Sequence, residues 1–179
     1  MAKLFQQYKE TVVPALMKQF SFGNLHQVPQ ISKITLNIGL GRVAKDPAFI
    51  ETAESSLSAI SGQKPVRNKA KKSIAGFKIR QGMVVGMSVT LRKARMYDFL
   101  DKLVSMTLPR VRDFRGIDKK YVDAHGNMSI GFKENAAFPE IRSDELERLH
   151  GLEVTITTTA HNKEEGLALF TALGFPFKE

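Results

Sequence analysis

Ten lysine and arginine side chains lie in a stretch of the sequence that contains no carboxylate. Between Ser55 and Tyr97 there is no Asp or Glu, and the cations in this stretch are Lys64, Arg67, Lys69, Lys71, Lys72, Lys78, Arg80, Arg92, Lys93 and Arg95. The chain has 27 basic and 18 acidic residues, so the remainder holds 17 against 18 and this block supplies the whole net charge of +9. A block of one sign predicts a polyanionic partner, because a solvated surface normally mixes both signs.

Residues that could support catalysis or bind a metal are not spaced for either task. The chain has no cysteine, which excludes a disulfide framework and a cysteine-ligated zinc or iron–sulfur site. Its four histidines show no paired metal-ligand spacing, and they are His26, His125, His150 and His161. No nucleophile elbow, Walker loop or zinc-protease motif occurs. We therefore expect no enzymatic activity, no catalytic residue, no cofactor and no metal site.

The length and hydropathy of the chain indicate a single soluble domain. No secretory signal opens the chain, and no stretch approaches the roughly 18 uninterrupted apolar residues that a membrane span requires. A chain of 179 residues can bury a core without cross-links. We expect a cytoplasmic protein with no membrane partner, folded as one domain over residues 1–179.

The elements that must position the cations follow from apolar spacing. Helices are expected over residues 4–20, with an interruption at Pro14, then over 47–61, 97–107 and 163–173. Asp46 and Gly62 are the expected caps of the second helix, and Asn162 with Glu165 forms a capping box for the last. Strands are expected over residues 33–40, 64–72, 84–92, 128–132 and 152–159. This mixture predicts an α+β fold, a mainly antiparallel sheet with helices packed on one face and a projecting hairpin loop at about 73–83.

The strand faces opposite the aliphatic ones are short and polar. On regular strands these faces carry Lys33, Thr35, Asn37 and Gly39, then Arg67, Lys69 and Lys71, then Gly86, Ser88, Thr90 and Arg92, and last Thr155, Thr157 and Thr159. Cations neutralise phosphates, while hydroxyls and amides bind phosphate and sugar oxygens, including the 2′-OH of RNA. The alternative is a face that contacts only water, as in many one-sided sheets. The cation block favours RNA.

The segment from Ser73 to Met83 is a second candidate contact. It places Phe77, Lys78, Arg80 and Gln81 between two glycines, so a stacking surface, two cations and an amide gather on one loop. The alternative is that the aromatic ring folds back onto the stem of its own loop. The sequence leaves both open.

Several motifs in order along the chain resemble one protein family. They read KITLN at 33–37, LSAISGQKP at 57–65, KAKKSIAGFKIRQG at 69–82, PRVRDFRG at 109–116, FPEI at 138–141, ITTTA at 156–160 and FPF at 175–177. Together they span essentially the whole chain. The sequence closely resembles the family of the fifth protein of the bacterial large ribosomal subunit.

That resemblance implies a function and a set of contact residues. Family members are structural constituents that bind 5S rRNA and attach it to the central protuberance, next to 23S rRNA and other 5S-associated proteins. The residues implied for 5S rRNA are Lys33, Thr35, Asn37, Gln63, Lys64, Lys69, Lys71, Lys72, Thr90 and Arg92. The loop implied to reach the P-site tRNA carries Ser73, Gly76, Phe77, Lys78, Arg80, Gln81 and Gly82. A bridge to a small-subunit head protein is expected at Arg110, Arg112, Asp113, Phe114 and Arg115.

One residue departs from the family motif. Asn68 stands where the family usually has a small hydroxyl or thiol residue, and we expect a changed local contact rather than lost binding. On a regular strand Asn68 lies on the opposite face from Lys69, which would keep it away from RNA.

Two other functions fit the same basic sheet. One is a free-standing RNA chaperone or ribosome assembly factor, which would not stay with washed large subunits. The other is an RNA-modifying enzyme, which would need a catalytic constellation that the sequence does not reveal.

Overall fold

The computed structural model describes residues 3–41, 43, 46–141 and 149–178. By its internal contacts the chain divides into two compact units. Unit 1 comprises Met1–Ile34, Leu91–Ile130 and Thr155–Glu179, and unit 2 comprises Thr35–Thr90 and Gly131–Val154. The expected single RNA-binding domain stays a prediction.

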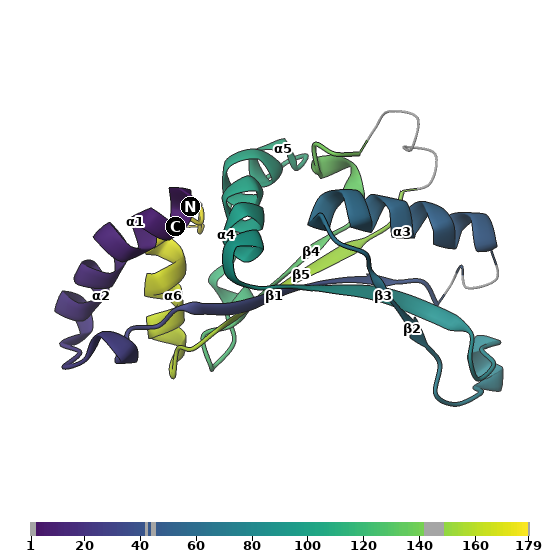
Figure 1. Cartoon of the computed structure of the whole chain (residues 1–179), viewed down its shortest axis with the longest axis horizontal. Coiled ribbons are helices and arrows are strands. Elements are labelled where there is room, and N and C mark those ends of the chain that lie inside the picture. Colours follow the sequence, from purple (N-terminus) through teal and green to yellow (C-terminus); the bar gives the residue numbers. More distant parts are fainter. Residues whose placement is uncertain (1–2, 42, 44–45, 142–148, 179) are drawn as a thin grey trace. The chain divides into compact units, whose positions relative to one another are not determined.

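The strands form one five-stranded sheet in the order β2-β3-β1-β5-β4 (Figure 1). Their bounds are Ile31–Gly39 for β1, Val66–Lys69 for β2, Val84–Leu91 for β3, Met128–Phe132 for β4 and Leu152–Thr158 for β5. The five strands lie within or close to the predicted ranges, although β2 is much shorter than the strand expected over 64–72. The fold is α+β with a mainly antiparallel sheet, as predicted.

In unit 2, helix α3 (Pro47–Ser61) lies along one face of the strands (Figure 1). It begins where predicted, because the Asp46 carboxylate accepts hydrogen bonds from the N–H groups of Ala48 and Phe49 at 3.1 and 3.2 Å. It ends at Gly62, which adopts the left-handed conformation with φ 70°. The core of unit 2 is aliphatic and aromatic, and its buried side chains include Leu36, Ile38, Leu40, Ala53, Leu57, Ile60, Met87, Val89, Phe132, Phe138, Leu152 and Val154.

In unit 1, each of two helical segments contains a π-helical turn just before a proline. Helix α1 (Lys3–Gln7) passes through a π-helical turn, Tyr8–Val12, into α2 (Val13–Phe20), which has Pro14 in its first turn. Helix α4 (Lys93–Lys102) passes through a second π-helical turn, Leu103–Thr107, into α5 (Leu108–Arg110). Proline offers no N–H to the helical ladder, and the wide turns accommodate that gap. The interruption at Pro14 was predicted. The predicted end of the other helix before Pro109 is wrong, because α5 contains this proline.

The N-terminal helical segment packs on α4 within unit 1. The rings of Phe5 and Tyr97 lie 4.9 Å apart, and the Tyr8 hydroxyl donates to the carbonyl of Pro29 at 3.1 Å. Burial raises the pKa of Tyr8 to about 12. The ring contact holds α1 against α4, and the hydrogen bond ties the wide turn to the segment before β1.

The last helix, α6 (Lys163–Ala172), begins differently from the prediction. Asn162 occupies the N-cap position, but its side chain makes no capping hydrogen bond. The Glu165 carboxylate instead accepts from the N–H of His161 at 2.9 Å. The predicted capping box is therefore wrong for Asn162, while Glu165 does satisfy a backbone donor near the start of the helix. In the described part of the chain, no helix is both long and apolar enough to cross a membrane.

Candidate nucleic-acid interface

In unit 2 the strands present a polar side opposite α3. Along β1, Leu36 and Ile38 are fully buried, whereas the alternating residues Thr35 and Asn37 are only half-buried. The Asn37 amide donates a hydrogen bond to the carboxylate of Glu153 on β5 at 3.4 Å. The predicted alternation of apolar and polar faces on β1 is therefore confirmed. The Glu153 carboxylate lies beside the Asn37 amide on the polar side.

The register of β2 on β3 decides which β2 side chains share that side. The antiparallel partners are Val66 with Ser88, Arg67 with Met87, Asn68 with Gly86 and Lys69 with Val84. Directly opposed residues point to the same face of a sheet. Because Met87 is buried in the core, Arg67 lies on the α3 side, and Val66 and Asn68 lie on the other. We define the polar face of unit 2 by Thr35, Asn37, Val66, Asn68, Ser88 and Thr90.

Arg67 pairs with α3 instead of joining the other cations. Its Nε donates to Glu54 Oε2 at 2.8 Å, and its Nη2 contacts the same oxygen. The prediction that Arg67 lies on the polar face is wrong, because Arg67 is opposite the buried Met87 and points to the α3 side. Beyond Asn68 the register shifts by one residue, because Asn68 lies opposite Gly86 and Lys69 lies opposite Val84, which leaves Val85 as the extra residue of a β-bulge on β3.

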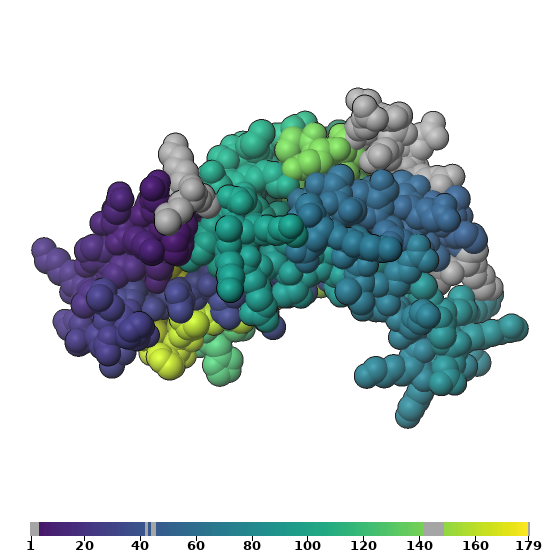
Figure 2. Space-filling model, viewed as in Figure 1, coloured from purple at the N-terminus to yellow at the C-terminus, as the bar shows by residue number. Residues whose placement is uncertain are grey.

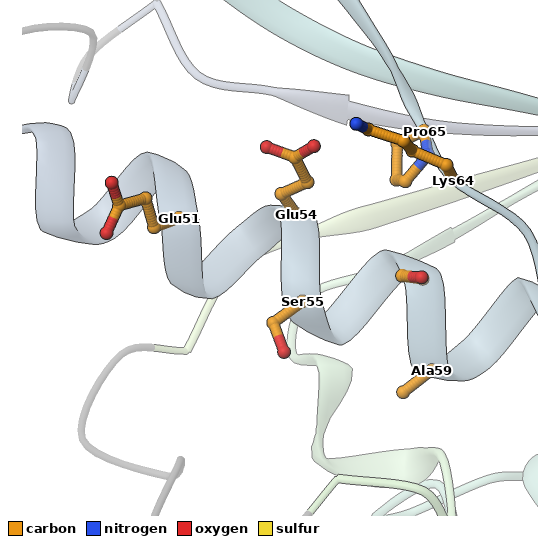
Figure 3. A pocket seen from close by; sticks show the side chains of 7 residues that line it. Glu51, Glu54, Ser55, Ala59, Lys64 and Pro65 are labelled. Carbon is orange, nitrogen blue, oxygen red and sulfur yellow. The ribbon is translucent and has the colours of Figure 1, made fainter.

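Gln63 and Lys64 lie just before β2, and their side chains have different surroundings. The Gln63 amide donates to the carbonyl of Thr90 at 3.0 Å, which ties the start of β2 to the end of β3. Lys64 is exposed and lines an open hollow of about 670 Å³ along α3, together with Glu51, Glu54, Ser55, Ser58, Ala59 and Pro65. Its ammonium extends toward Glu54 (Figure 3). Lys64 therefore lies on the helix side of the strands in this structure.

The connection between β2 and β3, residues 70–83, is held by its own backbone. The N–H of Ala70 donates to Met83 at 2.8 Å, and Ile74 and Ile79 exchange hydrogen bonds of 2.9 and 3.2 Å. The N–H of Gln81 donates to the Ser73 hydroxyl at 2.9 Å. The β2–β3 connection is thus a hairpin.

Side chains of the β2–β3 connection stand apart from one another at the surface (Figure 2). The Phe77 ring is 73% exposed, so it does not fold back onto its stem. Its neighbours Ser73, Gly76, Lys78, Arg80, Gln81 and Gly82 are exposed or nearly so, and Lys71 and Lys72 are exposed as well. The sequence left open whether the Phe77 ring folds onto its own loop or is free to stack on a partner. The structure favours the second interpretation.

In unit 1, several polar residues of or next to the strands form hydrogen bonds within the protein. The hydroxyls of Ser129 and Thr155 lie 3.2 Å apart. Thr159 exchanges two hydrogen bonds with the backbone of Gln30, of 3.0 and 2.9 Å. Lys33 is half-buried and Arg92 is exposed.

The expected bridge residues surround a tight turn in unit 1. Arg110, Arg112, Asp113 and Arg115 are exposed, and Phe114 is half-buried. Asp113 has a left-handed φ of 55°, and the N–H of Phe114 donates to Val111 at 3.3 Å. The turn therefore directs three guanidinium groups to solvent around one aromatic ring.

Comparison with known proteins places the chain in a family. Residues 24–80 match the family described as Ribosomal protein L5, and residues 84–177 match the family model for the C-terminus of the same ribosomal proteins. The chain belongs to the L5 family of ribosomal proteins.

Relatives of this L5 family chain share its full length. It is 52% identical to the large ribosomal subunit protein uL5 of Colwellia psychrerythraea, over 100% of this chain and 99% of that protein. It is 53% identical to uL5 of Herpetosiphon aurantiacus over 100% of both chains. It is 55% identical to uL5 of Cupriavidus metallidurans over 99% of this chain and 98% of that protein. These relatives are named as ribosomal proteins rather than enzymes, in agreement with the expectation from the sequence.

Sequence reasoning missed two members of the polar face in this L5 family chain. Val66 and Asn68 lie on it, although strict alternation had assigned that side to Arg67. No local signal distinguishes these positions, because the register depends on the partner strand. Within the described ranges, no group of three His, Asp or Glu side chains could hold a metal ion.

Proposed function

We propose that this L5 family chain is a structural constituent of the large ribosomal subunit that binds 5S rRNA through the polar face of unit 2. One observation carries the proposal. All four residues of β2 are exposed, and this strand lies within the block of ten cations that holds no carboxylate. A bare basic strand beside short hydroxyl and amide side chains suits a phosphate backbone.

Lysines and arginines supply the electrostatic part of the proposed binding. Lys69, Lys71 and Lys72 of unit 2 neutralise phosphates, while Lys64 on the helix side reaches a separate part of the RNA. Lys33 and Arg92 of unit 1 add further contacts. Each neutralised phosphate releases counterions, which makes the affinity depend on salt.

Neutral polar groups supply the remaining contacts. Thr35, Asn37 and Thr90 bind sugar and phosphate oxygens, and Gln63 keeps the first β2 residues next to β3. Glu153 beside Asn37 opposes phosphate locally, so the backbone of the RNA passes nearer to β2 than to β5.

Residues 73–82 of the β2–β3 connection are proposed to contact the P-site tRNA. Its exposed Phe77 offers a stacking surface, and Lys78 and Arg80 offer cations on the same hairpin. The turn from Arg110 to Arg115 is proposed to bridge to a small-subunit head protein. Further partners in this proposal are 23S rRNA and the other 5S-associated ribosomal proteins, within the cytoplasmic ribosome.

The salt dependence of 5S rRNA binding tests the central proposal. The dissociation constant is measured for purified protein and 5S rRNA over a range of salt concentrations, with tRNA as competitor. Replacing Lys69, Lys71 and Lys72 by Ala should flatten the slope of log K against log salt by about two to three units. Replacing Lys18, Lys133 and Lys163, three exposed lysines elsewhere, removes the same charge as a matched control.

Two results would contradict the proposal. An equal effect of both triple variants would show that only net charge matters and would remove β2 from the interface. Release of the protein from washed large subunits during sedimentation would favour a free-standing chaperone or assembly factor instead.

A further inference from the structure

Strand β2 forms one edge of the five-stranded sheet and pairs with β3 on its inner side (Figure 1). All four of its residues are exposed. Within the described part of the chain, no strand pairs with its outer side. An edge strand of this kind presents backbone N–H and C=O groups that have no partner in the sheet.

The hydrogen bonds next to β2 show which of its residues turn their backbone groups outward. Ala70, directly after β2, donates its N–H to the carbonyl of Met83 at 2.8 Å, so its backbone groups point to the β3 side. Backbone groups of an antiparallel strand alternate in direction from one residue to the next. Those of Asn68 therefore point to β3, whereas those of Arg67 and Lys69 point away from the sheet.

The hydrogen bonds of β3 agree with this assignment. The carbonyl of Val85 accepts from the N–H of Leu40, directly after β1, at 2.9 Å. By the same alternation, the next residue, Gly86, turns its backbone groups toward β2, where its partner is Asn68. The N–H groups of Arg67 and Lys69 are therefore open on the outer side of β2.

The side chains of β2 divide between the two sides of the sheet at this edge. Val66 and Asn68 lie on the polar face, where the Asn68 amide donates to the Ser88 hydroxyl at 3.2 Å. Arg67 lies on the α3 side, and Lys69, two residues further along the strand, shares that side. A ligand that contacts both the polar face and the Lys69 ammonium must pass along the outer edge of β2.

We propose that one strand of the bound RNA runs along the outer edge of β2, with the N–H groups of Arg67 and Lys69 on successive phosphates and the Arg67 carbonyl on a ribose 2′-OH between them. The inference deepens the proposed function and rests on it. The Arg67 side chain stays with Glu54, so Arg67 contacts the RNA through its backbone. Main-chain donors to phosphate position an RNA regardless of its sequence.

An RNA backbone fits this edge better than a peptide strand does. The edge repeats one donor and one acceptor every two residues, a step of about 7 Å. Each nucleotide likewise offers a phosphate that accepts hydrogen bonds and a 2′-OH that donates one. Lys69, Lys71 and Lys72 add positive charge, and no carboxylate occurs between Ser55 and Tyr97. The charge therefore favours a polyanion over a peptide.

Replacing one backbone N–H by an ester oxygen tests the proposal. The α-hydroxy analogue of lysine at position 69 keeps the ammonium group and removes the N–H. The affinity of the full chain for 5S rRNA should fall about 10-fold, the factor of one hydrogen bond to a charged group. The salt slope should stay unchanged, because no charge is lost. The same ester at Lys133, an exposed residue outside β2, is the matched control and should leave the affinity unchanged.

Side-chain variants separate the charge from the main chain. Lys69→Ala keeps the N–H and should flatten the salt slope by about one unit. Arg67→Ala should leave the slope unchanged within a few tenths of a unit, because Glu54 already neutralises its guanidinium. The thermal midpoint of each variant shows whether it is folded.

Hydrogen exchange of the unmodified protein reports on the same two N–H groups. The amides of Arg67 and Lys69 should exchange fast in the free protein and at least about 10-fold more slowly with 5S rRNA bound. The Asn68 amide, which points to β3, should exchange slowly in both states and serves as the internal control.

The outcomes distinguish the inference from the proposed function. If the ester at position 69 binds 5S rRNA as tightly as the amide, the edge assignment is overturned and the proposed function stands. Slow exchange of the two amides only in assembled large subunits, and not with 5S rRNA alone, would assign the edge to a strand of another protein and also overturn it. If the wild-type protein does not prefer 5S rRNA over tRNA, both proposals are overturned.

Discussion

Gly166 in α6 packs directly against Gly126 in the turn that precedes β4. A Cβ on Gly166 would collide with the Cα of Gly126, and a Cβ on Gly126 would lie 2.7 Å from the Cβ of Ala160. Gly126 also has a left-handed φ of 74°. The first turn of α6 and the turn before β4 therefore meet backbone to backbone, which two glycines permit.

Gly166→Ala should lower the free energy of unfolding by about 1–3 kcal/mol, the usual cost of forcing an extra methyl group into a packed contact. Urea denaturation measures the change. Gly23→Ala is the matched control in unit 1, because a Cβ there meets nothing within 4 Å. An equal change in both variants would contradict the close approach.

His150 should make the stability of unit 2 depend on pH. Burial lowers the pKa of His150 below its ordinary value of 6.5, and its Nε2 lies 3.3 Å from the Asn135 amide nitrogen. Below pH 6.5 the unfolded chain binds a proton at this residue that the folded chain does not. The free energy of unfolding should therefore fall as the pH decreases from about 6.5 toward the folded pKa. Denaturation at pH 7.5 and pH 5 measures this.

Two histidine variants identify the source of that pH dependence. His150→Gln should flatten the loss of stability on acidification, because no titrating ring remains in the core. His125→Gln, at an exposed position, should leave the loss as in the wild type. A flat profile for the wild type would contradict the role of burial.

Removing the cap of α3 should destabilise the protein. Asp46→Ala leaves the N–H groups of Ala48 and Phe49 without their carboxylate, at a cost of about 1 kcal/mol. Asp46→Ser keeps a capping oxygen and should recover most of that loss. Thermal or urea midpoints measure both variants, and a similar loss in the two would assign the effect to charge rather than capping.

The Phe77 ring should matter for tRNA but not for folding. Because it is 73% exposed, Phe77→Ala should change the free energy of unfolding by less than about 0.5 kcal/mol. Affinity for 5S rRNA should also stay constant, while the placement of P-site tRNA in reassembled ribosomes is disturbed, as footprinting would detect. Lost 5S rRNA binding would show that the Phe77 ring contacts 5S rRNA rather than tRNA.

The arginine turn in unit 1 should act between ribosomal subunits. Arg112→Glu reverses an exposed charge and should weaken association of the subunits without changing 5S rRNA affinity. Light scattering of mixed subunits measures the first quantity and filter binding the second. Lys163→Glu, a charge reversal on α6, is the control. Unchanged association in Arg112→Glu would move the bridge elsewhere.

The sequence by itself determined the features that depend on near neighbours. Alternation of apolar and polar residues at 33–39 predicted β1 and its two faces, because side chains in a strand alternate by geometry alone. Asp46 and Gly62 predicted both ends of α3, because caps act within a turn. The block of cations and the family motifs can also be recognised from the sequence without knowledge of the fold.

Only the tertiary structure decided which face the β2 residues occupy. Arg67 turns to Glu54 on α3, while Val66 and Asn68 lie on the polar face. This placement follows from the register of β2 on β3, and nothing in the composition of residues 66–69 marks it. The approach of Gly126 to Gly166 and the burial of His150 beside Asn135 were hidden for the same reason. Such contacts join residues distant in the chain, and their geometry exists only after the elements have packed.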